Sequence, residues 1–220
     1  MSSVPSKTTT PYDSPIEAAS VSKKAREVLV GARSVFLANG FAATTTDMIQ
    51  QAAGVSKSTV YAHYPNKEAL FVAVVEAECA RFLKTINEIT FSGKCLADIL
   101  LAIAQAYLEI VLSHDALALY RMVVAEAPRL PELGRRFYLA GPATINNIVA
   151  HRLEVAVSNG ELDLGGIGLV SAASLFVNMV RGEAHLQCLT HPNTPASAVQ
   201  RDQWAKDAVF AYLRAFALLT

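Results

Sequence analysis

Apolar residues recur at intervals of three and four positions along almost the whole chain after residue 21, which is the spacing of one face of an α-helix. The first such series lies between Ala25 and Phe36. It predicts a helix that starts near Ser22 and ends where Gly40 suits a left-handed C′ position and Phe41 can pack on Phe36. The ordered part of the chain therefore begins with a helix that buries one face.

Two short helices are predicted next, because capping and breaking residues follow one another closely. Thr45 is a suitable N-cap for a helix that Gly54 stops after about two turns, and Ser56 caps another. This second short helix must end before Pro65, and Asn66 then caps a long amphipathic helix. Helices of two turns are too short to be stable alone, so their neighbours must hold them. The first three helices, with a glycine turn between the second and third, form a helix-turn-helix unit.

From residue 94 onward the pattern contains helical periods and no strand alternation. The last two apolar segments are hydrophobic over more than one stripe, so this pair is either deeply buried or half of an intermolecular four-helix bundle. We expect an all-α fold, in which an N-terminal three-helix helix-turn-helix domain precedes a C-terminal helical bundle. The helices expected in the bundle are residues 96–113, 117–127, 131–159 with a break at Gly141-Pro142, 168–189 and 196–219.

Composition adds a reason to expect an apolar surface that is hidden from water. The chain of 220 residues is 52% hydrophobic and only 17% charged, whereas roughly 25% of the residues in a typical domain are charged. Part of the apolar surface is therefore expected to pack on another subunit or to line a cavity. The chain has no run of about 18 apolar residues, so no membrane span is expected.

Residues 1–20 differ in composition from the rest of the chain. Eleven of them are Ser, Thr or Pro, and such a segment buries too little apolar surface to offset the entropy of ordering. We expect a disordered arm at 1–20, the helix-turn-helix domain at 21–70 and a second domain at 71–220. The arm lacks an apolar block that could act as a signal peptide, so the interpretation is an intracellular, cytoplasmic protein.

The third helix, which is the second of the two short ones, has a side that suits contact with DNA. When its residues are placed at 100° intervals, Val60 and Tyr64 point to the core. The opposite face holds Ser58, Thr59 and Ala62, whose small polar groups and methyl let the helix approach base edges. Side chains at the rim can reach phosphates, which position the helix without reading sequence. These rim residues are Lys57, Tyr61, His63, Lys67 and, at the start of the preceding helix, Thr46.

The net charge of the whole chain differs from that of the predicted helix-turn-helix domain. Nineteen basic and nineteen acidic residues give a formal net charge of +0, so no global field attracts nucleic acid. Residues 21–70, however, hold six basic against three acidic residues, whereas residues 71–220 hold twelve against fourteen. The positive charge is thus placed with the helix-turn-helix. An ordinary solvated helix face remains the alternative on composition alone.

A motif of about forty residues, between positions 32 and 71, keeps every turn and cap of this unit in register. Its positions are Phe36, Gly40-Phe41, Thr44-Thr45, Ile49, Ala53-Gly54-Val55-Ser56, Tyr61, Tyr64, Asn66-Lys67-Glu68 and Leu70. The stretch resembles the DNA-binding domain of TetR-family transcriptional regulators. The resemblance implies an all-helical homodimer whose C-terminal bundle is a ligand-binding and dimerisation domain, with the last two helices at the dimer interface.

The family's DNA contacts can be carried over residue by residue. Two positions depart from the usual pattern: Asp47 stands where a basic residue is common, and Gln50 replaces a small alanine after Ile49. The departure at Asp47 puts a phosphate contact at that position in doubt. The contacts implied by the resemblance are Thr46, Lys57, Ser58, Thr59, Tyr61, Ala62, His63 and Lys67.

The C-terminal half contains no motif of comparable strength. A ligand cavity there is expected to be apolar with a few convergent polar groups, although polar residues among apolar ones can equally serve helix packing. No His, Cys or carboxylate cluster has metal-ligand spacing, and no cofactor or catalytic motif stands out, so we expect neither a metal site nor a cofactor nor an enzyme. The candidate ligand-binding residues are Tyr107, Tyr120, Arg121, Asn146, Asn147 and Asn178.

The sequence thus predicts a sequence-specific transcriptional regulator with two partners, a double-stranded DNA operator and a small effector. The favoured form is a repressor that a small, apolar ligand releases from its operator. The competing hypothesis is an all-helical small-molecule binding protein or enzyme whose helix-turn-helix does not bind DNA. Activation instead of repression also stays open.

Overall fold

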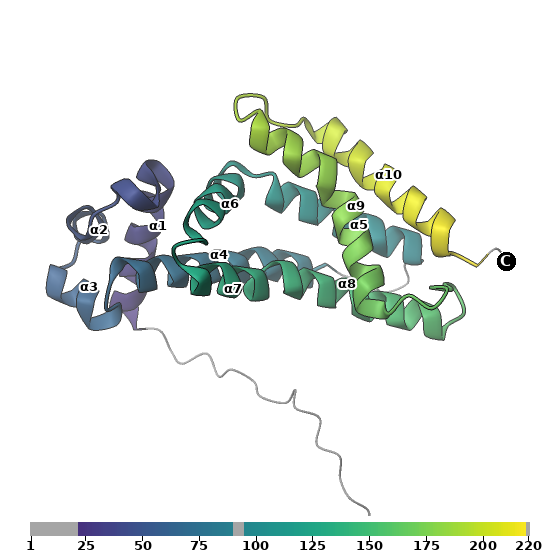
Figure 1. Cartoon of the computed structure of the whole chain (residues 1–220), viewed down its shortest axis with the longest axis horizontal. Coiled ribbons are helices and arrows are strands. Elements are labelled where there is room, and N and C mark those ends of the chain that lie inside the picture. The colour runs from purple at the N-terminus through teal and green to yellow at the C-terminus, as the bar shows by residue number, and fades with distance from the viewer. Residues whose placement is uncertain (1–21, 90–94, 219–220) are drawn as a thin grey trace, which may run out of the picture.

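The computed structural model describes residues 22–89 and 95–218, and these residues fold almost entirely into helices (Figure 1). The all-α class predicted from the pattern is confirmed. The predicted disordered arm at 1–20 lies outside the described residues. Two short helices, α2 and α3, lie at one end of an elongated molecule beside α1, and α4 runs from that end toward the middle. The bounds of these helices are α1 Lys23–Ala43, α2 Thr46–Ala53, α3 Lys57–His63 and α4 Lys67–Asn87.

The remaining helices form a bundle at the other end of the molecule (Figure 1). The long segment expected at 131–159 is two helices, and the break between them falls at Gly141-Pro142 as predicted. Helices α9 and α10 run side by side along one edge of the bundle, with α5 packed against both. The bounds are α5 Leu96–Val111, α6 His114–Glu126, α7 Pro131–Ala140, α8 Pro142–Ser158, α9 Leu169–Thr190 and α10 Ala198–Phe216.

Side-chain caps define the short helices. The side-chain oxygens of Thr45, Ser56 and Asn66 each accept a hydrogen bond from the backbone N–H three residues later, at 3.2, 3.2 and 2.7 Å. Gly54 ends α2 in the left-handed region, with φ 63° and ψ 34°, where a side chain is rarely tolerated. The predicted caps and the predicted glycine stop are confirmed. The turn between α2 and α3 is therefore set by local sequence.

The end of α1 differs from the prediction. Gly40 has a positive φ of 76°, but its ψ of 172° is extended, so the predicted left-handed stop is wrong in detail. The chain kinks there and makes a further short helical stretch to Ala43. The predicted contact between Phe36 and Phe41 is confirmed, with ring centroids 5.9 Å apart, and Phe71 of α4 packs on both rings. This aromatic cluster fixes α4 against the end of α1.

Helix α6 begins three residues earlier than predicted. His114 and Asp115, which lie between the helices expected at 96–113 and 117–127, form its first turn. The reason is Ser113, whose hydroxyl oxygen accepts a hydrogen bond from the backbone N–H of Ala116 at 3.3 Å and so acts as the N-cap. The earlier start brings Asp115 within reach of α1.

Two buried clusters share α4. The first contains the apolar faces of α1, α2 and α3 together with Phe71 and Val74 of α4, and it extends to Leu119 of α6 and Leu133 of α7. The second contains Ile86 near the end of α4 and the apolar faces of α5, α8, α9 and α10. The predicted division after residue 70 falls inside α4 and remains a prediction. Because one rigid helix is part of both cores, a displacement of α4 at one end reaches the other.

None of the described helices is both long and apolar enough to cross a membrane by itself. Among them, only α5 and α6 taken together have sufficient length and apolar composition, and these two helices are bent by 70° at the break between them.

Candidate nucleic-acid interface and ligand cavity

Helix α3 presents one face to solvent and is held by the other. Val60 is buried, with 2% of its surface exposed, and joins the core of α1 and α4. On the opposite side Ser58 and Ala62 are exposed and Thr59 is half-buried. The structure therefore leaves the predicted base-reading face open.

Hydroxyl groups tie this face to its surroundings. The Ser56 hydroxyl lies 2.8 Å from both the Ser58 and the Thr59 hydroxyls, so the N-cap of α3 also orients two residues of the exposed face. The Thr46 hydroxyl at the start of α2 lies 3.3 Å from the Tyr61 hydroxyl, and Tyr61 is 46% exposed. The two predicted phosphate contacts, Thr46 and Tyr61, are thus brought together at one rim of α3.

Two basic residues of the rim, Lys57 and His63, make different contacts. Lys57 forms an exposed ion pair with Asp47, with Nζ and Oδ1 2.9 Å apart, and this hydrogen bond raises the pKa of Lys57. Asp47, the departure from the family pattern, therefore offsets the charge of a predicted phosphate contact. His63 is exposed, and its Nε2 lies 3.5 Å from the Ser22 hydroxyl.

Lys67 has a structural role in this arrangement. Its ammonium group donates to the backbone carbonyls of Phe41 and Thr44, both at 2.9 Å, and lies 4.5 Å from the centroid of the Phe41 ring. A cation at the carboxyl end of a helix stabilises the free carbonyl groups there. Lys67 thus joins the start of α4 to the end of α1, and its contact with DNA remains a prediction.

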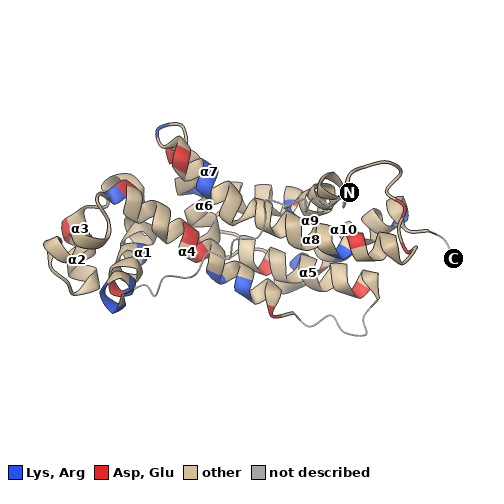
Figure 2. Cartoon of the chain, turned by 90° about the horizontal axis from the view of Figure 1, so that it is seen from below, with Lys and Arg blue, Asp and Glu red and all other residues tan. Residues whose placement is uncertain are grey.

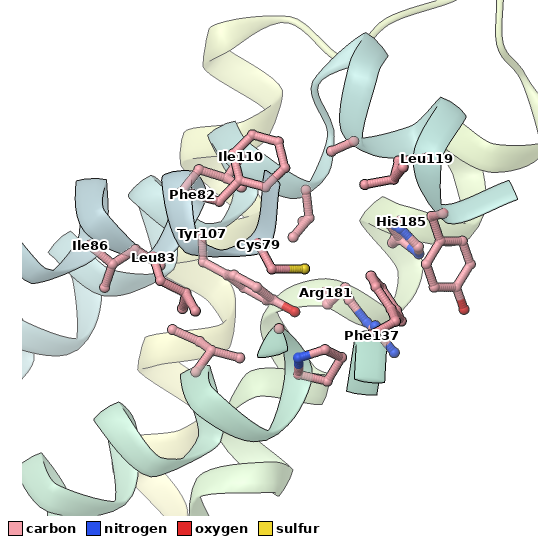
Figure 3. Close-up of a pocket in the computed structure, with 16 residues that line it drawn as sticks. Cys79, Phe82, Leu83, Ile86, Tyr107, Ile110, Leu119, Phe137, Arg181 and His185 are labelled. Atoms are coloured by element: carbon pink, nitrogen blue, oxygen red, sulfur yellow. The ribbon is translucent and has the colours of Figure 1, made fainter. Parts of the chain in front are cut away.

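A cavity lies in the body of the molecule between α4, α5, α6 and α9, with the junction of α7 and α8 closing one side (Figure 3). Its volume is about 80 Å³. Its wall is mostly apolar, and four residues of α4 take part. These residues are Cys79, Phe82, Leu83 and Ile86.

Four side chains bring polar atoms to this wall: Tyr107, Tyr120, Arg181 and His185. Burial raises the pKa of Tyr107, with Arg181 acting in the opposite direction, so the phenol is neutral. Burial, together with the charges of Arg181 and Arg121, lowers the pKa of His185 to about 4, so its ring is uncharged at pH 7. The rings of Tyr120 and His185 meet edge to face, with centroids 4.6 Å apart. Arg181 is the one charged group among the described lining residues.

Two of the predicted ligand-binding residues, Tyr107 and Tyr120, line this cavity. Sequence reasoning missed Arg181 and His185, one turn apart on α9. The available signal was the composition of α9, which contains only two charged residues, Arg181 and Glu183. The helical period alone does not say which side of α9 meets α5 and α6.

The other four predicted ligand residues do not line the cavity. Arg121 points outward and donates to the carbonyls of Cys188 and Leu189 at the end of α9. Asn178 is exposed and bonds back to Ser174 on its own helix, and Asn147 is exposed. Asn146 is half-buried, and its Oδ1 has no hydrogen-bond partner in the described part of the chain.

An ion-pair cluster joins α1 to α4 and α6. The guanidinium of Arg33 contacts Glu78 at 2.8 Å and Asp115 at 2.6 Å, and Arg81 contacts Glu78 at 2.9 Å. Burial by itself raises the pKa of Glu78, but the hydrogen bonds from Arg33 and Arg81 outweigh it and hold that pKa below its ordinary value. Glu78 is adjacent to the cavity residue Cys79. The cluster therefore links the helix-turn-helix to the wall of the cavity.

The described residues contain no group of three or more His, Cys, Asp or Glu side chains that could hold a metal ion.

Comparison with known families matches both halves of the chain. Residues 28–74 match the family model described as "Bacterial regulatory proteins, tetR family", and residues 98–218 match "AefR-like transcriptional repressor, C-terminal domain". The second match alone spans more than half of the chain. Both models describe transcriptional regulators, so the chain is a regulator and not an enzyme.

Among curated relatives, the chain is similar to the "HTH-type transcriptional regulator UidR" of Escherichia coli K12, with 30% identity over 142 residues, or 61% of this chain and 67% of that protein. It is similar to the "HTH-type transcriptional repressor AcnR" of Corynebacterium glutamicum, with 24% identity over 62% of this chain and 68% of the relative. The match to AcnR of Corynebacterium efficiens, 33% identical, covers 29% of this chain and about a third, 34%, of that protein.

Solved structures cover more of the chain. A TetR-family regulator from Mesorhizobium loti MAFF303099 superposes with a TM-score of 0.79 at 25% identity, over 89% of this chain and 97% of that one. The "Flavonoid-responsive Regulator FrrA" superposes with a TM-score of 0.74 at 31% identity, over 90% and 98% of the two chains.

Proposed function

Because the chain belongs to the TetR family of bacterial transcriptional regulators, we propose that it is a cytoplasmic repressor that a small ligand releases from its operator. The observation that carries this proposal is the position of α4. Its first half belongs to the core that holds α3, and its second half lines the cavity. The repressor names of the AcnR relatives and the flavonoid response of FrrA support a repressor with a small organic effector.

In this proposal α3 enters the major groove. Ser58, Thr59 and Ala62 meet base edges, because small polar groups and a methyl permit close approach. The rim residues position the helix on the phosphates and add affinity without sequence preference. The proposed phosphate contacts are Thr46, Lys57, Tyr61, His63 and Lys67.

Release follows from the geometry of α4. A ligand larger than the cavity of about 80 Å³ must displace its wall. Cys79 and Leu83 belong to that wall, whereas Leu70 and Phe71 of the same helix lie in the core of the helix-turn-helix. Displacement of α4 then moves α3 away from the spacing of about 34 Å that two successive major-groove sites require.

Two recognition helices require a dimer, which we propose forms through α9 and α10. Leu175, Met179 and Leu186 of α9 are 46%, 44% and 59% exposed and recur at helical spacing, and Phe210 of α10 is 69% exposed. In Figure 2 the ribbon of α9 shows little of the blue and red that mark charged residues, because α9 contains only two of them, Arg181 and Glu183. Two copies of the α9–α10 pair form a four-helix bundle that covers this apolar face.

The operator proposal is tested with fluorescently labelled DNA from upstream of the chain's own gene, with no ligand added. We expect Ser58→Ala to change the preferred sequence and to weaken binding to the native site by about tenfold, as for the loss of one base contact. Tyr61→Phe is expected to weaken binding to all sequences, because it removes a phosphate contact. Fluorescence anisotropy at two salt concentrations measures both effects.

Lys84→Ala is the control for a change outside the proposed interface, because Lys84 is an exposed residue in the last turn of α4, remote from α3. Binding that is insensitive to salt and indifferent to sequence contradicts the operator proposal. If Ser58→Ala leaves the preferred operator sequence unchanged, Ser58 does not read a base.

The dimer proposal is tested with Leu186→Glu. A carboxylate in the centre of an apolar interface is desolvated without a partner, so the variant is expected to sediment as a monomer and to bind the operator at least about a hundredfold more weakly. Val124→Glu on α6 is the control, because Val124 is similarly exposed, at 53%, on a helix outside the proposed interface. Analytical ultracentrifugation gives the mass of each. A monomeric unmodified protein, or a dimeric Leu186→Glu variant, overturns this interface.

A further inference from the structure

The cavity holds one positive charge in an apolar wall. Among its described lining residues only Arg181 is charged, since His185 and Tyr107 are neutral at pH 7. Arg181 is half-buried on α9, and in Figure 3 its guanidinium lies on the cavity side with the Tyr107 hydroxyl directed toward it. A charge in such surroundings lowers stability unless a group of opposite charge compensates it.

No such group is supplied by the described part of the chain. Arg33, Arg81, Arg129 and Arg136 each form an ion pair with at least one carboxylate. Within residues 22–89 and 95–218, Arg181 forms none, and the groups that interact with it are the Tyr107 phenol and the His185 ring. Both are neutral hydrogen-bonding groups. Among the described residues the cavity therefore contains a cation with no carboxylate partner, next to two neutral hydrogen-bonding groups.

We propose that the effector is a small apolar molecule with a single carboxylate, which Arg181 binds with help from Tyr107 and His185. This inference rests on the proposed function of the cavity as the effector site. A guanidinium bound to a carboxylate forms strong, charge-assisted hydrogen bonds, and one arginine neutralises one negative charge. A phosphate dianion leaves a net negative charge in an apolar wall, so the site favours a monoanion.

The rest of the wall defines the body of that molecule. Leu83, Ile86, Ile110 and Phe137 also line the cavity, and their side chains offer no polar partner. The cavity volume of about 80 Å³ is well below the 300–1,000 Å³ or so of sites for drug-sized ligands. The carboxylate is therefore attached to one ring or to a short aliphatic chain.

The test compares isosteric ligands on the full-length protein. Benzoate, benzamide and benzylamine share size and shape but carry a negative, a neutral and a positive group, and hexanoate replaces the ring by a chain. Isothermal titration calorimetry is expected to give dissociation constants at least about tenfold lower for benzoate or hexanoate than for benzamide, as for one charge-assisted contact. Benzylamine is expected not to bind.

Arg181→Met keeps the length of the side chain and removes its charge. We expect this variant to lose the preference for the carboxylate while it still binds benzamide, and Arg181→Lys to retain part of the preference. Arg26→Met is the control, because Arg26 is an exposed arginine of α1. Equal affinities for benzoate and benzamide, an unchanged preference in Arg181→Met, or no saturable binding of any monocarboxylate overturns the inference.

Operator binding without ligand separates this inference from the proposed function. If the protein binds its operator but none of the carboxylates, the repressor proposal stands and the effector class is wrong. If it binds benzoate through Arg181 but no DNA, the effector class stands and the repressor proposal is wrong.

Discussion

Gly31→Ala is expected to abolish specific DNA binding and to lower the free energy of unfolding by about 1–3 kcal/mol, the range for an overpacked core. A Cβ at residue 31 of α1 meets the backbone nitrogen and the Cβ of Ala53 at 2.7 Å and its Cα at 2.8 Å. Backbone atoms of a helix cannot rotate away as a flexible side chain does. The methyl therefore pushes α1 and α2 apart, and α3 moves with α2.

The effect is measured by urea unfolding and by anisotropy with operator DNA. Val30→Ala is the control, because its side chain is 64% exposed one position away on the same helix, and it is expected to change neither quantity. A double variant with Ala53→Gly is not expected to restore binding, since the backbone contacts at 2.7 and 2.8 Å remain. If Gly31→Ala binds its operator as tightly as the unmodified protein, the close approach of α1 and α2 is not required.

Arg33→Met is expected to lower the free energy of unfolding by about 2 kcal/mol at pH 7. Removal of one partner from a buried ion pair costs about 3–5 kcal/mol, and this value is reduced because the Arg33 side chain is 31% exposed. The variant leaves Glu78, whose side chain is 9% exposed, with Arg81 alone and removes the arginine contact of Asp115. It also removes the ion pairs that join α1 to α4 and α6, two of the helices that line the cavity.

The effect of Arg33→Met on the free energy of unfolding is expected to decrease as the pH falls. The pKa values of Glu78 and Asp115 are both held below their ordinary values in the folded protein, in each case with Arg33 among the causes. The stabilisation of the fold by these two carboxylates is therefore fully present above the ordinary pKa range of carboxyl groups. It is lost as the pH falls through their folded-state pKa values. The difference between Arg33→Met and the unmodified protein should shrink on acidification, as followed by urea unfolding between pH 7 and pH 3.

Lys24→Met is the control for charge alone. Lys24 forms an ion pair with Glu27 at 2.9 Å on the surface of the same helix, where water screens the charges. It is expected to have no measurable effect on unfolding. Equal stabilities of Arg33→Met and Lys24→Met contradict a stabilising role for the buried cluster.

Local sequence determined the helix-turn-helix. Thr45, Gly54, Ser56 and Asn66 act through hydrogen bonds to backbone groups three or four residues away or through their own φ and ψ angles. Such interactions depend on neighbours in the chain, so caps and turns could be predicted without coordinates. The exposed face of α3 followed in the same way from one buried residue, Val60, and the helical period.

Only the tertiary structure decided the content of the cavity and the contacts between distant helices. Arg181 meets Tyr107 across 74 positions of sequence, and Arg33 meets Asp115 across 82. Helical periodicity marks which residues of a helix share a face, but it does not state which other helix that face meets. For this reason the helices and the exposed face of α3 could be predicted from the sequence, whereas the position of Arg181 in the cavity wall and the contacts of Arg33 with α4 and α6 required the packing of the helices.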